Sequence, residues 1–104
     1  MDRLRQTLRV AKERAILVAA HLPRASDTDD LAELAALARS AGAVVVDRFQ
    51  QKIRKINPST YLGKGKAEEL ARKVKKLNAD VIIFDNNLSP AQIRDLEEIT
   101  QTKV

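Results

Sequence analysis

The hydrophobic pattern of the chain alternates between short apolar runs and longer segments in which apolar residues recur every three or four positions. Residues 14–20 form a continuous apolar run, and residues 80–85 form a second one. Such runs are typical of strands buried on both faces of a parallel sheet. A third run begins at 43–46 but turns polar and basic from Asp47 onward. This pattern predicts an edge strand whose far end leaves the sheet.

A helix is predicted after each strand. Ser26 or Asp27 caps the first helix, which extends to about Ala41 and ends at Gly42, because short polar side chains favour helix starts and glycine favours helix ends. The next helix covers about residues 66–78, with an apolar inner stripe and basic residues that point outward.

Two features of the later helices refine this prediction. Glu68 and Glu69 are expected in the first turn of the helix at 66–78, where acids stabilise the helix dipole. Ser89 caps the third helix, with Pro90 at its first position. Residues 102–104 are read as the start of a fourth strand, and because a domain rarely ends there, we expect the chain to be a fragment of a larger protein.

The succession of strands and helices predicts an α/β fold. We expect a small, doubly wound parallel sheet with strand order 2-1-3-4 and helices on both faces. The two most apolar strands belong in the middle of this sheet, and the basic strand belongs at an edge. Residues 1–13 form a basic N-terminal extension, and residues 14–104 form the α/β domain.

Composition narrows the possible chemistry. The 104 residues contain no cysteine and one histidine, which excludes disulfides, thiol catalysis and a multi-histidine metal site within this chain. No apolar run approaches the ~18 residues of a membrane span, and no signal peptide is visible. We therefore expect a cytoplasmic protein without a membrane partner.

The net charge of +5 is unevenly distributed. Ten basic and two acidic residues lie between Arg48 and Lys76, whereas residues 27–33 hold four acids and no base. A basic band on a small domain is typical of a protein with a polyanionic partner. A solvated helix face is the alternative interpretation of the same charges.

A turn with two glycines and two lysines precedes the helix at 66–78. In this turn, Gly63 and Gly65 allow backbone N–H groups to approach a phosphate, and Lys64 and Lys66 add positive charge. The spacing does not match a nucleotide-binding P-loop, because Thr60 replaces the first glycine and Ala67 replaces the hydroxyl that holds magnesium. We expect no catalytic residue and no metal site in this chain.

Polar residues also follow the two central strands. Asp85 comes directly after the strand at 80–85, and His21 comes directly after the strand at 14–20, at the sheet edge where α/β proteins bind ligands. Asp85 is either a metal or proton ligand or, as is commoner after a strand, a turn residue. No nucleophile–histidine–carboxylate pattern can be assembled from these residues.

Two stretches together closely resemble the N-terminal domain of HflX-type GTPases. They are residues 60–70, TYLGKGKAEEL, and residues 85–97, DNNLSPAQIRDLE. Residues 14–18, 31–34 and 41–42 fit the same family in order and spacing, so the resemblance covers about residues 13–104. Asn86 and Asn87 stand where the family often has an acidic residue.

The resemblance implies a ribosome-associated GTPase that binds the large ribosomal subunit and helps to split stalled or stressed ribosomes. A helical hairpin and a GTPase domain would follow this chain, and GTP and magnesium would bind there, with no cofactor in the present fragment. Charge and position select the residues expected to contact ribosomal RNA: Lys52, Arg54, Lys55, Lys64 and Lys66, then Arg72 and Lys73, with Gly63 and Gly65 as a backbone phosphate turn.

Two other functions stay open at this point. The turn at 63–66, with Asp85 and His21, is a candidate site for a small-molecule phosphate or nucleotide. Alternatively, the domain docks against the helical and GTPase domains of its own protein, with the basic band on an acidic surface.

Overall fold

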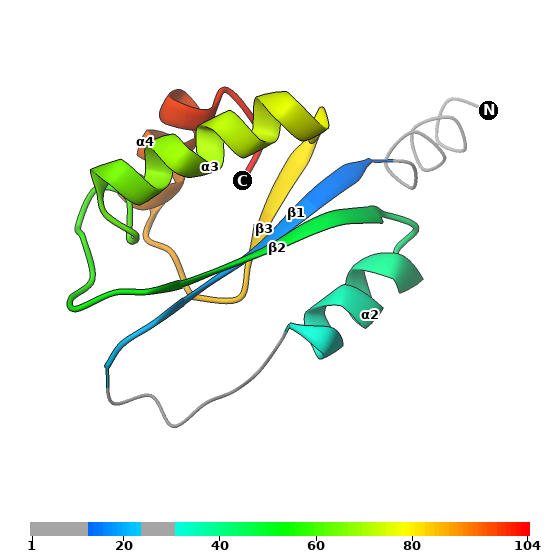
Figure 1. Ribbon diagram of the computed structural model, residues 1–104, viewed down its shortest axis with the longest axis horizontal. Helices are drawn as coiled ribbons and strands as arrows, with labels where there is room; N and C mark the ends of the chain where they lie inside the picture. Colours follow the sequence, from blue (N-terminus) through cyan, green and yellow to red (C-terminus); the bar gives the residue numbers. More distant parts are fainter. Residues whose placement is uncertain (1–12, 24–30) are drawn as a thin grey trace.

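The computed structural model describes residues 13–23 and 31–104, and within them it contains three strands and three helices. All three strands are parallel, in the order β2-β1-β3. Helix α2 lies on one side of the sheet, and α3 and α4 lie on the other (Figure 1). The predicted α/β class, with a parallel sheet and helices on both faces, is confirmed. The elements are β1 (Arg14–His21), α2 (Ala32–Ser40), β2 (Val44–Lys52), α3 (Lys64–Leu77), β3 (Val81–Phe84) and α4 (Pro90–Thr100).

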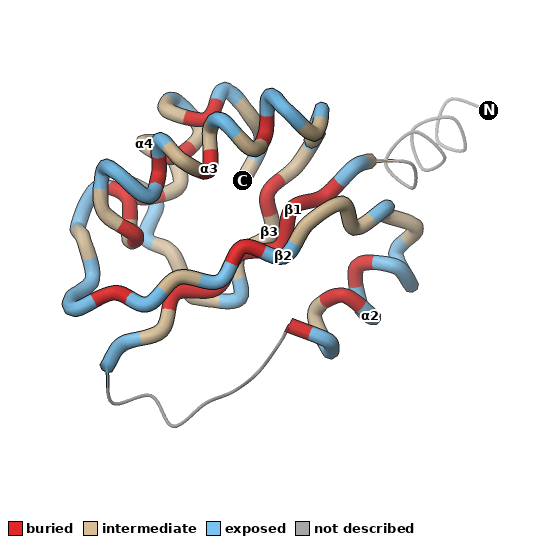
Figure 2. The backbone as a smooth tube through the Cα atoms, viewed as in Figure 1, coloured by how far each residue is buried: buried red, intermediate tan, exposed pale blue. Residues whose placement is uncertain are grey.

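Strand β1 is the centre of the core. Residues 15–20 are all buried, because the strand pairs on both edges and is covered on both faces (Figure 2). Ile16 and Val18 pack with Leu70 of α3 on one face. Leu17 packs with Ala35 of α2 and its neighbours on the other face. The continuous apolar run is therefore explained by two separate hydrophobic clusters on the two sides of one strand.

The predicted fourth strand is absent from the described sheet. Lys103 instead forms an isolated parallel bridge with Val81, in which its carbonyl accepts a hydrogen bond from the Ile82 N–H at 2.8 Å. The bridge lies on the edge of β3 that faces away from β1, because the other edge is paired with β1. One bridged residue is too short to make a strand, so the observed order is 2-1-3.

Strand β2 lies at the edge of the described sheet, as expected, but its polar half does not leave the sheet. Pairing with β1 continues to Lys52, and the Ile53 N–H donates to the His21 carbonyl at 2.9 Å. A bulge explains the irregular pattern of this strand, because Val46 is an extra residue between the pairs formed by Val45 and Asp47. The bulge reverses the side-chain phase, so that Phe49 and Ile53 face α3 and polar residues alternate with them.

The helix ends follow local sequence signals. Gly42 has φ +94° after α2, a conformation that favours glycine. The hydroxyl of Ser89 accepts from the Gln92 N–H at 3.1 Å, and the Gln92 side chain accepts from the Ser89 N–H at 2.8 Å, so the predicted cap of α4 is confirmed as a full capping box. The predicted caps of α2, Ser26 and Asp27, lie outside the described residues.

Candidate nucleic-acid interface

The segment between β2 and α3 folds around one asparagine. The Oδ1 atom of Asn57 accepts hydrogen bonds from the N–H groups of Ser59 at 2.7 Å and Thr60 at 2.9 Å. The backbone of Asn57 also exchanges two hydrogen bonds with that of Tyr61. Asparagine favours such turns because its side chain can replace a backbone acceptor. We call residues 53–63 the basic loop, after Arg54 and Lys55.

The end of the basic loop sets the start of α3. Thr60 is 3% exposed, and its hydroxyl accepts a hydrogen bond from the Gly63 N–H at 3.0 Å. Tyr61 has φ +66° and Gly63 has φ +94°, so the chain turns sharply here. Gly63 needs to be glycine for this backbone, whereas Gly65 lies within the helix with no positive φ. A Cβ at Gly65 would meet no atom within 4 Å, so packing does not require glycine there.

Helix α3 begins at Lys64, earlier than predicted, and this changes the role of its acids. Its first turn contains no acidic residue, and no side chain caps it. Glu68 and Glu69 lie one turn further on, so the prediction that they stand in the first turn is wrong. The positive end of the helix dipole therefore lacks an acidic partner within that turn and carries Lys64 and Lys66 besides. Such a helix end favours an anion.

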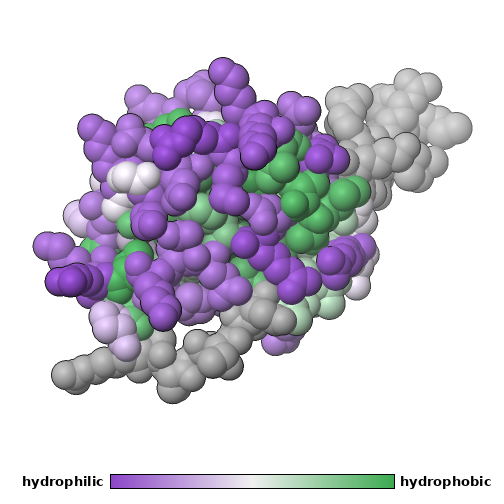
Figure 3. All heavy atoms as spheres, in the orientation of Figure 1, coloured by the Kyte–Doolittle hydropathy of each residue, from purple (hydrophilic) through white to green (hydrophobic). Residues whose placement is uncertain are grey.

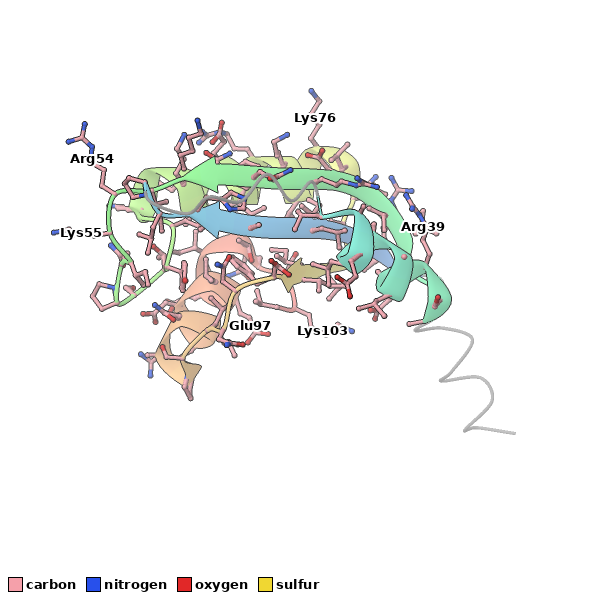
Figure 4. All side chains as sticks on the ribbon, turned by 90° about the horizontal axis from the view of Figure 1, so that it is seen from below. Arg39, Arg54, Lys55, Lys76, Glu97 and Lys103 are labelled. Atoms are coloured by element: carbon pink, nitrogen blue, oxygen red, sulfur yellow. The ribbon has the colours of Figure 1, made fainter. Side chains whose placement is uncertain are left out.

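Four of the predicted RNA-contacting residues line one hollow beside this helix end. The hollow has a volume of about 400 Å³. Ile53 and Leu62, both buried, also line it. Figure 4 shows Arg54 and Lys55 pointing outward at one end of the molecule. We call this site the basic hollow, and its charged lining residues are Lys52, Arg54, Lys55 and Lys66, beside Gly63.

The two second-rank residues lie elsewhere. The Lys73 ammonium is 2.8 Å from Oδ2 of Asp47 and lies over the Phe49 ring. Lys73 was expected to point outward, but the bulge turns Asp47 toward α3 and brings the two charges together. Arg72 lines a groove between the carboxyl ends of α3 and α4, with Lys75 and Ile99. Neither residue lines the basic hollow.

The side of the molecule seen in Figure 3, with α3 above β2 and α2 below it, is largely hydrophilic. Hydrophobic side chains gather on it near the start of β2, where Val44 is 49% exposed. Polar and charged residues cover α3 and the side of the molecule toward the basic loop. The distribution suits a partner that presents charge rather than a large apolar surface.

The residues after the central strands form no joint site with the basic hollow. His21 shares a hydrogen bond of 3.1 Å with Gln50 of β2. Asn86 both accepts from the Ala20 N–H and donates to the Ala20 carbonyl, so its side chain extends the pairing of β1 beyond β3. Neither His21 nor Asp85 lines the basic hollow.

Sequence reasoning missed the contacts between the basic loop and α4. Gln92 is 6% exposed, and its Nε2 donates to the Asn57 carbonyl at 2.8 Å. The Ser59 hydroxyl donates to Oδ2 of Asp95 at 2.7 Å. The hydrogen bond from Ser59, and then that from Arg94, lowers the pKa of Asp95 below its ordinary value of 3.8. The sequence held one signal of these contacts: the polar residues at 92 and 95 are three positions apart, so they lie on the same face of the helix.

Two further kinds of site are not found in the part of the chain that the structure describes. No group of three or more histidine, aspartate or glutamate side chains is arranged to hold a metal ion in residues 13–23 and 31–104. Within the same residues, no helix has the length and apolar character needed to span a membrane.

Comparison with known proteins agrees with the resemblance seen in the two motifs. Residues 28–104 match the family described as GTP-binding GTPase N-terminal. The chain is 46% identical over 98 residues to GTPase HflX of Lacrimispora saccharolytica, with 93% of this chain and 23% of that protein covered. It is 37% identical over 94 residues to GTPase HflX of Escherichia coli, with 90% of this chain and 22% of that protein covered.

The matched part is a small share of these relatives. The chain spans less than a quarter of the length of each of the two curated relatives. Their matches nevertheless cover at least 90% of this chain, and the family match over residues 28–104 includes both motifs. The chain therefore belongs to the GTP-binding GTPase N-terminal family, the N-terminal domain of HflX-type GTPases.

Proposed function

We propose that this chain is an RNA-contacting module that binds the large ribosomal subunit. In the complete protein it would help a GTPase to split stalled or stressed ribosomes in the cytoplasm. The family membership and the names of the relatives support the GTPase part of this proposal. The basic hollow supports the RNA part, and it is the observation that carries the proposal.

The chemistry of the hollow suits a phosphate backbone. Four cationic side chains from β2, the basic loop and α3 surround a space beside a helix start that carries no cap and no acid. Lysine and arginine contacts to phosphates give affinity without reading sequence. Recognition of structured RNA by shape uses contacts of this kind. The backbone at Gly65 is open to close approach by a phosphate.

GTP and magnesium fit the rest of the protein better than this chain. Ala67 stands where a P-loop needs the hydroxyl that holds magnesium, and it is fully buried. Thr60 stands at the first glycine position, and its hydroxyl is used by Gly63. The residues present do not suit the nucleotide, so we assign GTP hydrolysis to a domain outside this chain.

Co-sedimentation with purified large ribosomal subunits tests the proposal. The double variant Lys64→Glu/Lys66→Glu should sediment with subunits much less than the parent does. Arg39→Glu is the matched control, because Arg39 is also exposed but lies on α2, at the other end of the view in Figure 4. Equal sedimentation of parent and double variant across a salt series would rule out the start of α3 as the RNA contact.

A second candidate is docking against the other domains of the same protein. The groove between α3 and α4, of about 520 Å³, favours it, because apolar Val74 and Ile99 line it beside Arg72 and Lys75. An acidic, partly apolar protein surface suits such a groove. Arg72→Glu/Lys75→Glu should then weaken domain association while this chain keeps its RNA affinity.

A further inference from the structure

The basic loop and the start of α4 form one hydrogen-bonded unit. Gln92 joins them, because its backbone N–H and side-chain oxygen complete the capping box with Ser89 while its Nε2 donates to the Asn57 carbonyl. The Ser59 hydroxyl adds a second link, to Asp95 one turn further along α4.

We propose that α4 is a positioning element for the RNA contact, in which Asp95 and Gln92 hold the basic loop in one conformation. This inference rests on the proposed function. Neither residue contributes a cation, and neither lines the basic hollow. They act instead on Asn57 and Ser59, which lie in the same loop as Arg54 and Lys55. Two of the four cations of the hollow therefore depend on α4 for their placement.

Positioning matters here because the loop would otherwise be ordered only when RNA binds. Ordering a loop and its long side chains during association reduces affinity, and a loop held in its bound conformation avoids that loss. The Gln92–Asn57 hydrogen bond is partly buried, and the Ser59–Asp95 hydrogen bond lies at the surface. In this proposal the two bonds together hold the loop against α4 before any partner arrives.

Replacing Asp95 tests this inference, because loss of its charge and loss of its hydrogen bond to Ser59 should change RNA affinity in opposite directions. A carboxylate near a basic surface repels RNA, and it also pairs with Arg94 at 3.2 Å. Removing it should tighten RNA binding if only charge matters. If Asp95 acts by holding Ser59, removing it should weaken binding instead.

The experiment measures the affinity of this chain for a structured hairpin of large-subunit ribosomal RNA at fixed salt. We expect Asp95→Ala and Ser59→Ala each to weaken binding, by about threefold to tenfold. The double variant should be no weaker than either single one, because both remove the same link. Glu98→Ala is the matched control, since Glu98 is exposed on α4 and its backbone carbonyl accepts a hydrogen bond from the Gln101 side chain rather than from the loop.

Hydrogen exchange separates positioning from general loss of stability. In Asp95→Ala, amide exchange should speed up at residues 53–63 and stay unchanged in β1 and α2. Tighter binding by Asp95→Ala, equal to that of Glu98→Ala, would overturn the inference while leaving the proposed function in place. Absence of salt-dependent binding by the parent would instead overturn the proposed function, and the positioning inference with it.

Discussion

The ammonium of Lys73 on α3 lies 2.8 Å from the Asp47 carboxylate on β2 and 5.6 Å from the centre of the Phe49 ring. This contact ties α3 to the edge strand directly after the bulge. Lys73 is therefore engaged within the protein, although it belongs to the same basic band as the residues of the basic hollow.

We expect Lys73→Ala to affect stability more than RNA binding. A partly exposed ion pair with a cation–π contact contributes about 1 kcal/mol, so the free energy of unfolding in urea should fall by about that amount. RNA affinity should change much less than in Lys66→Ala, which removes a cation from the basic hollow. Equal losses of affinity in the two variants would show that Lys73 leaves Asp47 to contact RNA.

Gly65→Ala should raise the stability of the fold slightly but lower the affinity for RNA. Alanine is favoured over glycine in a helix by up to about 1 kcal/mol, and a Cβ here meets no neighbour, so the variant should be slightly more stable. The added methyl group would keep a phosphate from the backbone, so RNA binding should weaken. Gly63→Ala is the contrasting variant, because φ +94° should make it less stable. Unchanged RNA affinity in Gly65→Ala would show that RNA phosphate does not contact the backbone of α3 at this position.

The sequence predicts the elements well where one local signal decides the structure. The apolar run of β1 and the Ser89–Pro90 start of α4 both correspond to what the structure shows. Strand β2 was harder, because the bulge at Val46 reverses the phase and makes its polar half look unlike a paired strand. The polar half of β2 is held in the sheet by pairing with β1, and the sequence pattern of residues 44–52 alone does not reveal that pairing.

The cations of the candidate site could be selected from the sequence, but the residues that hold the basic loop in place could not. Lys52, Arg54, Lys55 and Lys66 are close because β2 ends where α3 begins, and charge density alone identified them. Gln92 was not identified, since a polar residue at helical spacing is usually exposed. It is buried because the basic loop folds back on α4 and offers the Asn57 carbonyl.

The Asp95 carboxyl should titrate below 3.8, and Ser59→Ala should raise its pKa toward that value. A lowered pKa means that the folded state favours the ionised form, so the stabilisation is complete above pH 3.8 and is lost as the pH falls through the pKa of the folded state. The destabilisation caused by Ser59→Ala should thus be smaller at pH 3 than at pH 6. NMR titration of the side-chain carboxyl carbon measures the pKa directly, and equal values in parent and variant would show that Ser59 does not lower it.

The purified chain should hydrolyse neither GTP nor ATP above background. The positions that a P-loop needs for phosphate and magnesium are Thr60 and Ala67 here, and both side chains are buried. Phosphate release measured at high protein concentration checks this. Turnover that disappears in Lys66→Ala would contradict the prediction and make the basic hollow a nucleotide site.

The salt dependence of RNA binding should report how many cations of the basic hollow contact phosphate. Each phosphate neutralised contributes about −0.7 to −0.9 to the slope of log affinity against log salt, so four contacts give a slope of about −2.8 to −3.6. Arg54→Gln and Lys55→Gln should each make the slope shallower by nearly one, because glutamine keeps a long polar side chain without the charge. Arg39→Gln removes the same charge from α2 and should leave the slope nearly unchanged. If all three variants reduce the slope equally, net charge rather than the basic hollow determines RNA binding.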